Sequence, residues 1–227
     1  MKCELFFVLL LVTIGQLSYS GEPSIFETRW VPTKPEVLTY KSTSPQGSGL
    51  YQVSLSRGDS TIEVYLNMIS PGFTKTVTGS MTFTMHPLSS EARIFVNDQI
   101  GMTTRCLYED NRLHISTIMK PYNRVMAADS TFEAPVVDFS QIPLLVRVLP
   151  LKTGMIRTFG SVNPRTNQIV PLTLQVAGED TVQKIPCLRV KLQDFEGLAI
   201  YWVEKRSPHR VIRIEQPESH RVTELLQ

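Results

Sequence analysis

The methionines are the side chains of this sequence that most suggest a chemical role. Five of them fall in one β-rich segment: Met68, Met81, Met85, Met102 and Met119. Because the thioether side chain is unbranched and polarizable, methionine suits adaptable apolar surfaces. On a curved sheet, such a surface could bind an acyl chain or another apolar small molecule. The alternative is that these five side chains fill an ordinary hydrophobic core.

The cysteines leave two interpretations open. Cys106 and Cys187 are the two cysteines beyond the N-terminal segment. A disulfide between them would close a loop of about 80 residues, for which loop entropy predicts roughly 4 kcal/mol of stabilisation. The alternative is a pair of buried thiols that pack as small apolar groups. Neither cysteine has CxxC spacing or a neighbouring His or Lys cluster, so the sequence gives no sign of a reactive thiol.

Signatures of catalysis and of metal binding are missing from the sequence. It contains no nucleophile elbow in a strand–turn–helix context, no HExxH, no phosphate-binding loop and no dinucleotide-binding GxGxxG. The histidines are spread singly, at spacings that no common metal site uses: His86, His114, His209 and His220. The sequence therefore predicts a non-enzymatic protein, with no catalytic residues, no metal and no cofactor.

The first twenty residues have the form of a secretory signal peptide. Lys2 gives a basic start, Leu5–Ile14 is an apolar run, and small residues, Ser18 and Ser20, occupy the −3 and −1 positions of a cleavage site. The apolar run is shorter than the roughly 20 residues needed to span a bilayer. We therefore expect cleavage after Ser20, export to the periplasm or the extracellular space, and no transmembrane segment in the mature chain.

The formal net charge bears on two classes of partner. It is +2 for the whole chain. A balance this small gives no electrostatic reason to expect nucleic acid or an anionic membrane as a partner.

Alternation of apolar and polar residues predicts an all-β protein. Tyr51–Leu55 and Ile62–Met68 alternate strictly and are separated by the turn-forming segment Arg57–Ser60, a pattern typical of a β-hairpin with one buried face. About a dozen such short runs follow at roughly 8–12-residue spacing. This pattern predicts an antiparallel curved sheet or open half-barrel, with two β lobes as one form of it.

One stretch breaks the β pattern and suggests the domain organisation. Asp or Ser before an apolar run, with Pro143 near its start and Pro150 at its end, predicts a short helix over 139–149 capped by Asp138 or Ser140. It would link two β-rich lobes, 36–127 and 155–226. We expect these lobes to form a single domain over 36–226, after an extended lead-in at 21–35.

The C-terminal half resembles a family of exported bacterial proteins, the domain of unknown function 3108 family. The segments that carry the resemblance are Phe159–Thr166, Val170–Val176, Val182–Leu192, Tyr201–Lys205 and Arg210–Glu215, with Val146–Leu151 similar to the link between the halves. The likeness covers roughly 36–226 and is strongest after about 140. It implies a curved antiparallel sheet in the cell envelope of a Gram-negative type of bacterium, and it implies no catalytic residue.

Two functions of different kinds follow from these observations. The first is a non-enzymatic binding or carrier domain that holds a lipid-like or other apolar ligand on the concave face of the sheet. The second is a structural or protein-interaction module of the cell envelope, with a filled core and a protein partner at a sheet edge. An apolar cavity above about 300 Å³ would favour the first, and a filled core would favour the second.

Overall fold

The computed structural model describes residues 26–27, 29, 31–132, 135–163 and 165–226. The predicted signal peptide, 1–20, and part of the predicted lead-in lie outside the described residues. Most described residues belong to β-strands, and one α-helix, α1, spans Ile142–Val148.

The first β segment is a meander of eight strands. Each strand pairs antiparallel with the next, from β1 to β8. The hairpin predicted from Tyr51–Leu55 and Ile62–Met68 is confirmed as β2–β3. The strands are β1 (Glu36–Ser44), β2 (Gly47–Arg57), β3 (Thr61–Ser70), β4 (Phe73–Thr82), β5 (Pro87–Val96), β6 (Gln99–Glu109), β7 (Arg112–Met119) and β8 (Arg124–Thr131).

The second β segment continues the same sheet. It comprises β9 (Val136–Val137), β10 (Ile156–Asn163), β11 (Gln168–Val182), β12 (Ile185–Asp194), β13 (Gly197–Glu204), β14 (Val211–Gln216) and β15 (Arg221–Leu225). β15 pairs with β1, so strands from both β segments lie in one 15-stranded sheet whose edges are β8 and β9. Pairing is antiparallel throughout except between β9 and β10. The predicted all-β, antiparallel, curved fold is confirmed.

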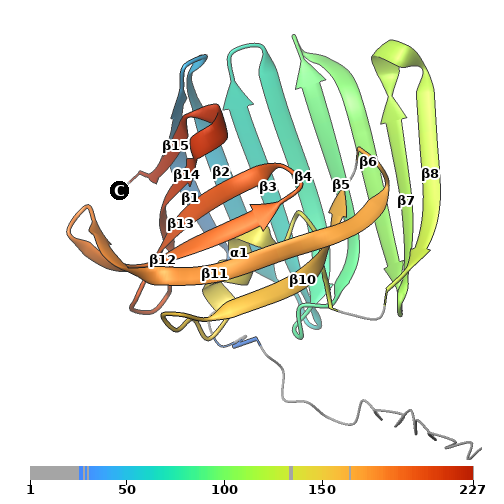
Figure 1. Cartoon of the computed structure of the whole chain (residues 1–227). Helices are drawn as coiled ribbons and strands as arrows, with labels where there is room; N and C mark the ends of the chain where they lie inside the picture. The colour runs from blue at the N-terminus through green and yellow to red at the C-terminus, as the bar shows by residue number, and fades with distance from the viewer. Residues whose placement is uncertain (1–25, 28, 30, 133–134, 164, 227) are drawn as a thin grey trace, which may run out of the picture.

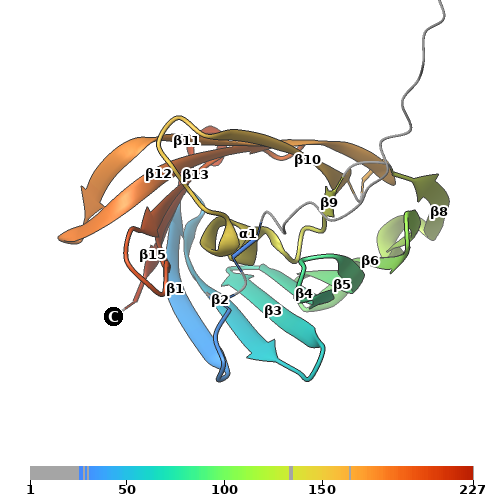
Figure 2. The ribbon, with the colours of Figure 1, turned by 90° about the horizontal axis from the view of Figure 1, so that it is seen from below.

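The sheet curls around α1, as seen from below in Figure 2. Six of the seven helix residues are buried, including Leu144, Leu145 and Val146, at 0% exposure each. A helix that is apolar all round needs burial on every side, and the inside of the curved sheet supplies it. The helix thus fills the lower part of the space inside the sheet, which we call the lumen.

The helix begins later than its predicted cap. Its N-cap is Gln141, which makes no side-chain capping hydrogen bond, so the prediction of Asp138 or Ser140 as the cap is wrong. Asp138 instead accepts a hydrogen bond from the backbone N–H of Ser140, 2.8 Å from its Oδ1. The carboxylate therefore closes an Asx turn one residue before the helix.

The strand alternation explains which side chains face the lumen. In β3, Ile62, Val64 and Leu66 are buried, whereas Glu63 and Tyr65 between them are exposed. Adjacent strand residues point to opposite faces, so the apolar member of each pair faces the lumen. No helix in the described part of the chain has the length and apolar character needed to cross a membrane.

Candidate ligand-binding cavity

A cavity of about 190 Å³ lies in the lumen above the start of α1. One wall is the inner face of β3 to β6, with Leu66, Met68, Val77 and Met102 among its side chains. An engineered apolar cavity of about 150 Å³ binds benzene. The space inside this sheet therefore suits a small apolar group, and it is smaller than the roughly 300 Å³ at which drug-sized sites begin.

The opposite wall and the floor come from the second half of the chain. Tyr201, Ile214 and Thr223 face the cavity from β13, β14 and β15, and Phe139 and Ile142 form its floor at the start of α1. Burial raises the pKa of the Tyr201 phenol well above its usual range, so this group stays neutral at physiological pH. The two β segments thus meet across one largely apolar space.

Four charged side chains line one part of the cavity, which we call its mouth: Lys75, Arg165, Asp194 and Glu196. The Lys75 ammonium lies 4.0 Å from a Glu196 carboxylate oxygen. Asp194 Oδ1 accepts a hydrogen bond of 2.7 Å from the Glu196 backbone N–H, and partial burial, followed by the negative charge of Glu196, raises the pKa of Asp194. Arg165 also lines the mouth, and within the described residues its guanidinium belongs to no ion pair.

Only two of the five predicted methionines meet in this cavity. Met68 and Met102 line it. Met81 and Met85 are buried in the core, where Gln141 Nε2 lies 3.4 Å from Met81 Sδ and donates a 2.8 Å hydrogen bond to the Met85 carbonyl. Met119 is half-buried at the end of β7, opposite Met102 in the strand register. Met68 and Met102 thus remain candidate ligand-lining residues. Met81 and Met85 are core residues, as the alternative interpretation has it.

The two cysteines are free thiols in separate parts of the core. Cys106 on β6 packs with Tyr108 and Ile115, and Cys187 on β12 belongs to the cluster that contains Trp202. Burial raises the pKa of both thiols. The sequence left open a disulfide or two buried thiols. In the structure Cys106 and Cys187 are buried thiols, and no disulfide joins them.

A buried polar cluster holds the turn before α1 against the sheet. The Asp138 side chain is fully buried, and its Oδ2 accepts hydrogen bonds from Ser90 Oγ at 2.7 Å and from the Tyr108 hydroxyl at 2.5 Å. Burial, followed by the negative charge of Asp138, raises the pKa of Tyr108. The sequence interpretation missed this cluster, because its members lie 30 and 48 residues from Asp138. The only local signal is an acidic residue between the apolar Val137 and Phe139.

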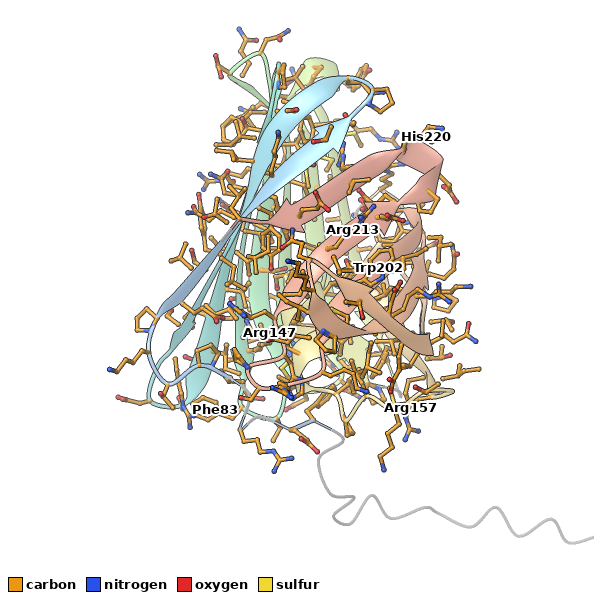
Figure 3. The ribbon with its side chains drawn as sticks, turned by 90° about the vertical axis from the view of Figure 1, so that its left-hand side faces the viewer. Phe83, Arg147, Arg157, Trp202, Arg213 and His220 are labelled. Carbon is orange, nitrogen blue, oxygen red and sulfur yellow. The ribbon has the colours of Figure 1, made fainter. Side chains whose placement is uncertain are left out.

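A second polar group lies on the outer side of the second half. The indole N–H of Trp202 donates a 3.0 Å hydrogen bond to Asp180 Oδ2. The Arg213 guanidinium carbon lies 5.5 Å from the centre of the Trp202 ring, in the geometry of a cation–π contact. Figure 3 shows Trp202 and Arg213 beside each other on this side of the molecule. We interpret the group as an anchor for the long β11–β12 hairpin.

One comparison with a solved structure agrees with this architecture. No protein-family model matches the sequence, and no curated protein matches it. The chain is similar in structure to a β-barrel-like protein of domain of unknown function 1849 from Brucella abortus, with a TM-score of 0.57 and 9% identity over 87% of this chain and 98% of that one. A domain of unknown function 1329 protein from Desulfovibrio piger aligns with a TM-score of 0.28 and 7% identity, over 87% of this chain and 85% of that one.

The first of these likenesses shows the fold and nothing further. The description of the Brucella protein names a β-barrel-like domain of unknown function and no enzymatic activity. Membership of the domain of unknown function 3108 family stays a prediction. The fold of the chain is therefore similar to that β-barrel-like protein, and it takes the form of one open, curved antiparallel sheet.

Proposed function

We propose that this chain is an exported, non-enzymatic binding protein that holds a small apolar or amphipathic ligand in the lumen of its curved sheet. The observation that carries the proposal is the apolar cavity above α1, built jointly by both β segments. Within the proposal, the N-terminal segment is removed after Ser20 and the protein acts in the periplasm or outside the cell, as the signal-peptide pattern of residues 1–20 predicts.

The cavity favours an apolar ligand because its walls are aliphatic, aromatic and thioether side chains. Its size suits one short acyl or aromatic segment, since about 190 Å³ exceeds the roughly 150 Å³ that accepts benzene. The charged residues lie only at the mouth, so a longer amphipathic ligand would place its polar end there, beside Lys75 and Arg165. Such a distribution, apolar walls with few polar groups at one end, is typical of small-molecule sites.

One feature favours the alternative function, a protein-interaction module. β8 is an edge strand of the sheet, and within the described residues β7 is the one strand that pairs with it. An unpaired edge is a template for a strand from a partner. The cavity, at about 190 Å³, is below the roughly 300 Å³ expected for a ligand carrier. What supports ligand binding over this alternative is the apolar character of its walls and their origin in both β segments.

Two measurements test the proposal. Native mass spectrometry of the protein purified from its own compartment, followed by solvent extraction, should reveal a stoichiometric apolar adduct. In solution, the apolar fluorophore N-phenyl-1-naphthylamine should bind saturably, and fatty acids of increasing length should displace it.

A cavity-filling variant localises the site. Ala92 lines the cavity and is 4% exposed, so Ala92→Leu should reduce probe binding at least tenfold. Ala128 faces inward on β8 and does not line the cavity, so Ala128→Leu serves as the matched control and should leave binding unchanged. Equal binding by the wild type and both variants, or no saturable binding at all, would overturn the proposal.

A further inference from the structure

Exposed apolar side chains concentrate at one end of the first β segment. Among the described residues, twelve large hydrophobic side chains are exposed, and seven of them lie at this end. We call these seven the apolar rim. Their exposure runs from 37% for Ile118 to 78% for Tyr122, and the full set is Leu50, Ile69, Val96, Ile100, Ile118, Tyr122 and Val125.

The strand register makes the apolar rim a nearly continuous row. Leu50 on β2 pairs with Ile69 on β3, and Ile118 on β7 pairs with Val125 on β8. Ile100 on β6 pairs with Phe95, the neighbour of Val96 on β5. Leu50 lies three positions from the start of β2, and the other six residues lie at or beside strand ends next to the β3–β4, β5–β6 and β7–β8 turns. These turns are at the upper end of Figure 1.

The cavity lies near the same end of the sheet. Met68, which lines it, is the sequence neighbour of Ile69, and Met102 pairs with Met119 beside the β7–β8 turn. Lys75, which lines the mouth, follows Thr74 in β4, and Thr74 pairs with the rim residue Ile69 on β3. The mouth is therefore adjacent to the apolar rim. The apolar rim thus follows the outer side of the wall whose inner side forms the cavity.

Charge distinguishes the two halves of this end. In the first half, Lys41 pairs in register with Leu50, and Lys120 and Arg124 flank Tyr122, with Asp98 as the acid of the β5–β6 turn. In the second half, the turns after β12 and β14 carry acidic residues instead: Asp194, Glu196 and Glu218. The apolar rim is therefore bordered by basic side chains, whereas the opposite side of the mouth is of mixed charge, with Arg165 beside these acidic residues.

We infer that the apolar rim docks this domain on the surface of an anionic lipid bilayer. Exposed aliphatic side chains enter the boundary between headgroups and acyl chains, a tyrosine suits that boundary, and neighbouring Lys and Arg attract anionic headgroups. A row of hairpin ends can meet a flat, deformable surface without the complementary shape that a protein partner needs. Docking brings the mouth of the cavity to the bilayer, where the ligand would be exchanged. This role in exchange rests on the proposed function, whereas the docking itself does not.

Vesicle co-sedimentation tests the docking directly. The chain without residues 1–20 is mixed with vesicles of phosphatidylethanolamine and phosphatidylglycerol, and separately with phosphatidylcholine vesicles. We expect stronger binding to the anionic vesicles. Tyr122→Ser combined with Val125→Asp should weaken it at least tenfold, and Lys120→Gln should weaken it about fivefold, the effect of one basic residue near an anionic surface.

Val37→Asp is the matched control. Val37 is 57% exposed on β1, and its register partner Ser54 places it at the other end of the sheet from Leu50. This variant should bind anionic vesicles as the wild type does. Equal loss in Val37→Asp and in the Tyr122/Val125 variant, while circular dichroism shows both folded, would overturn the inference, as would no binding of the wild type.

Two further outcomes are distinguishable. A dimer in sedimentation velocity that Val125→Asp abolishes, without vesicle binding, would assign the apolar rim to a second copy of this chain and overturn the inference. Vesicle binding without saturable uptake of N-phenyl-1-naphthylamine would support the docking and refute the proposed ligand-binding function. Uptake of the fluorophore without vesicle binding would support the proposed ligand-binding function and refute the docking.

Discussion

The guanidinium of Arg147, inside the curved sheet, lies 2.5 Å from the carboxylate of Glu36, measured from Nη1 to Oε2. The two residues are 111 positions apart, and the contact joins α1 to the first strand of the sheet. The Arg147 side chain is 1% exposed, and its Nη2 also donates a 3.3 Å hydrogen bond to the Pro208 carbonyl. Figure 3 shows Arg147 in the lower half of the molecule, above Phe83 and Arg157.

We predict that breaking this ion pair from one side costs more than removing it altogether. Glu36→Gln leaves a buried guanidinium without its counter-charge, and such changes cost about 3–5 kcal/mol. Because Glu36 is 21% exposed, solvent screening places the expected loss at the lower end of this range, about 3 kcal/mol. The double variant Glu36→Gln/Arg147→Met should recover most of it. Urea denaturation of the four proteins in the cycle measures the coupling, and a double variant no more stable than Glu36→Gln would contradict the prediction.

The cluster around Asp138 should contribute strongly to stability. Asp138→Ala leaves the hydroxyls of Tyr108 and Ser90 buried without their acceptor, so we expect a loss of about 3 kcal/mol or more in the free energy of unfolding. Tyr108→Phe removes one donor and leaves Ser90 bonded to the carboxylate, with an expected loss of about 2 kcal/mol. Chemical denaturation measures both values, and a Tyr108→Phe loss equal to or larger than that of Asp138→Ala would refute this order.

Gly79 and Ser140 form a steric pair that fixes the turn before α1 on β4. A Cβ on Gly79 would lie 2.1 Å from Ser140 Oγ and 2.5 Å from Ser140 Cβ. Gly79→Ala should therefore displace this turn and lower stability by about 1–3 kcal/mol, as overpacking of a core does. Ser140→Ala in the same protein keeps the clashing Cβ and should not restore stability, whereas Ser140→Gly should. Thermal melts of the single and double variants would show whether the clash is responsible.

The raised pKa of Asp194 predicts a pH dependence at the mouth of the cavity. Because its folded-state pKa is above the unfolded value of about 3.9, the folded protein holds this proton more tightly. Its contribution to stability is complete below the unfolded pKa and decreases as pH rises through that value toward the folded pKa. Asp194→Asn keeps an Oδ1 acceptor for the Glu196 N–H and removes the titration.

The measurement is the free energy of unfolding as a function of pH. The wild type should lose stability relative to Asp194→Asn as pH rises above about 4, and the difference should level off above the folded pKa. Glu215→Gln serves as a control, since Glu215 lies on β14 and pairs with Arg213. A difference between wild type and Asp194→Asn that is independent of pH would show that the carboxyl is not desolvated in the folded protein.

Alternation and turn residues determined the secondary structure of this protein. Strict alternation in Ile62–Met68 predicts a strand with one buried face, because only one face of a sheet lies against the core. Asp110 and Asn111 predict the β6–β7 turn from local chemistry, because Asp and Asn tolerate a positive φ. Asp110 adopts such a φ, 51°. The apolar run after Asp138 predicts the helix, now bounded at Ile142–Val148.

The candidate site was decided by the tertiary structure. Alternation does not say which lumen-facing side chains will meet a helix and which will face empty space, so Met68 and Met102 line the cavity while Met81 packs against Gln141. The pairing of β15 with β1, which joins the two β segments into one sheet, depends on contacts between residues more than 170 positions apart. Such long-range pairing is specified by packing across the whole sheet rather than by any local pattern, and it alone brings the two walls of the cavity together.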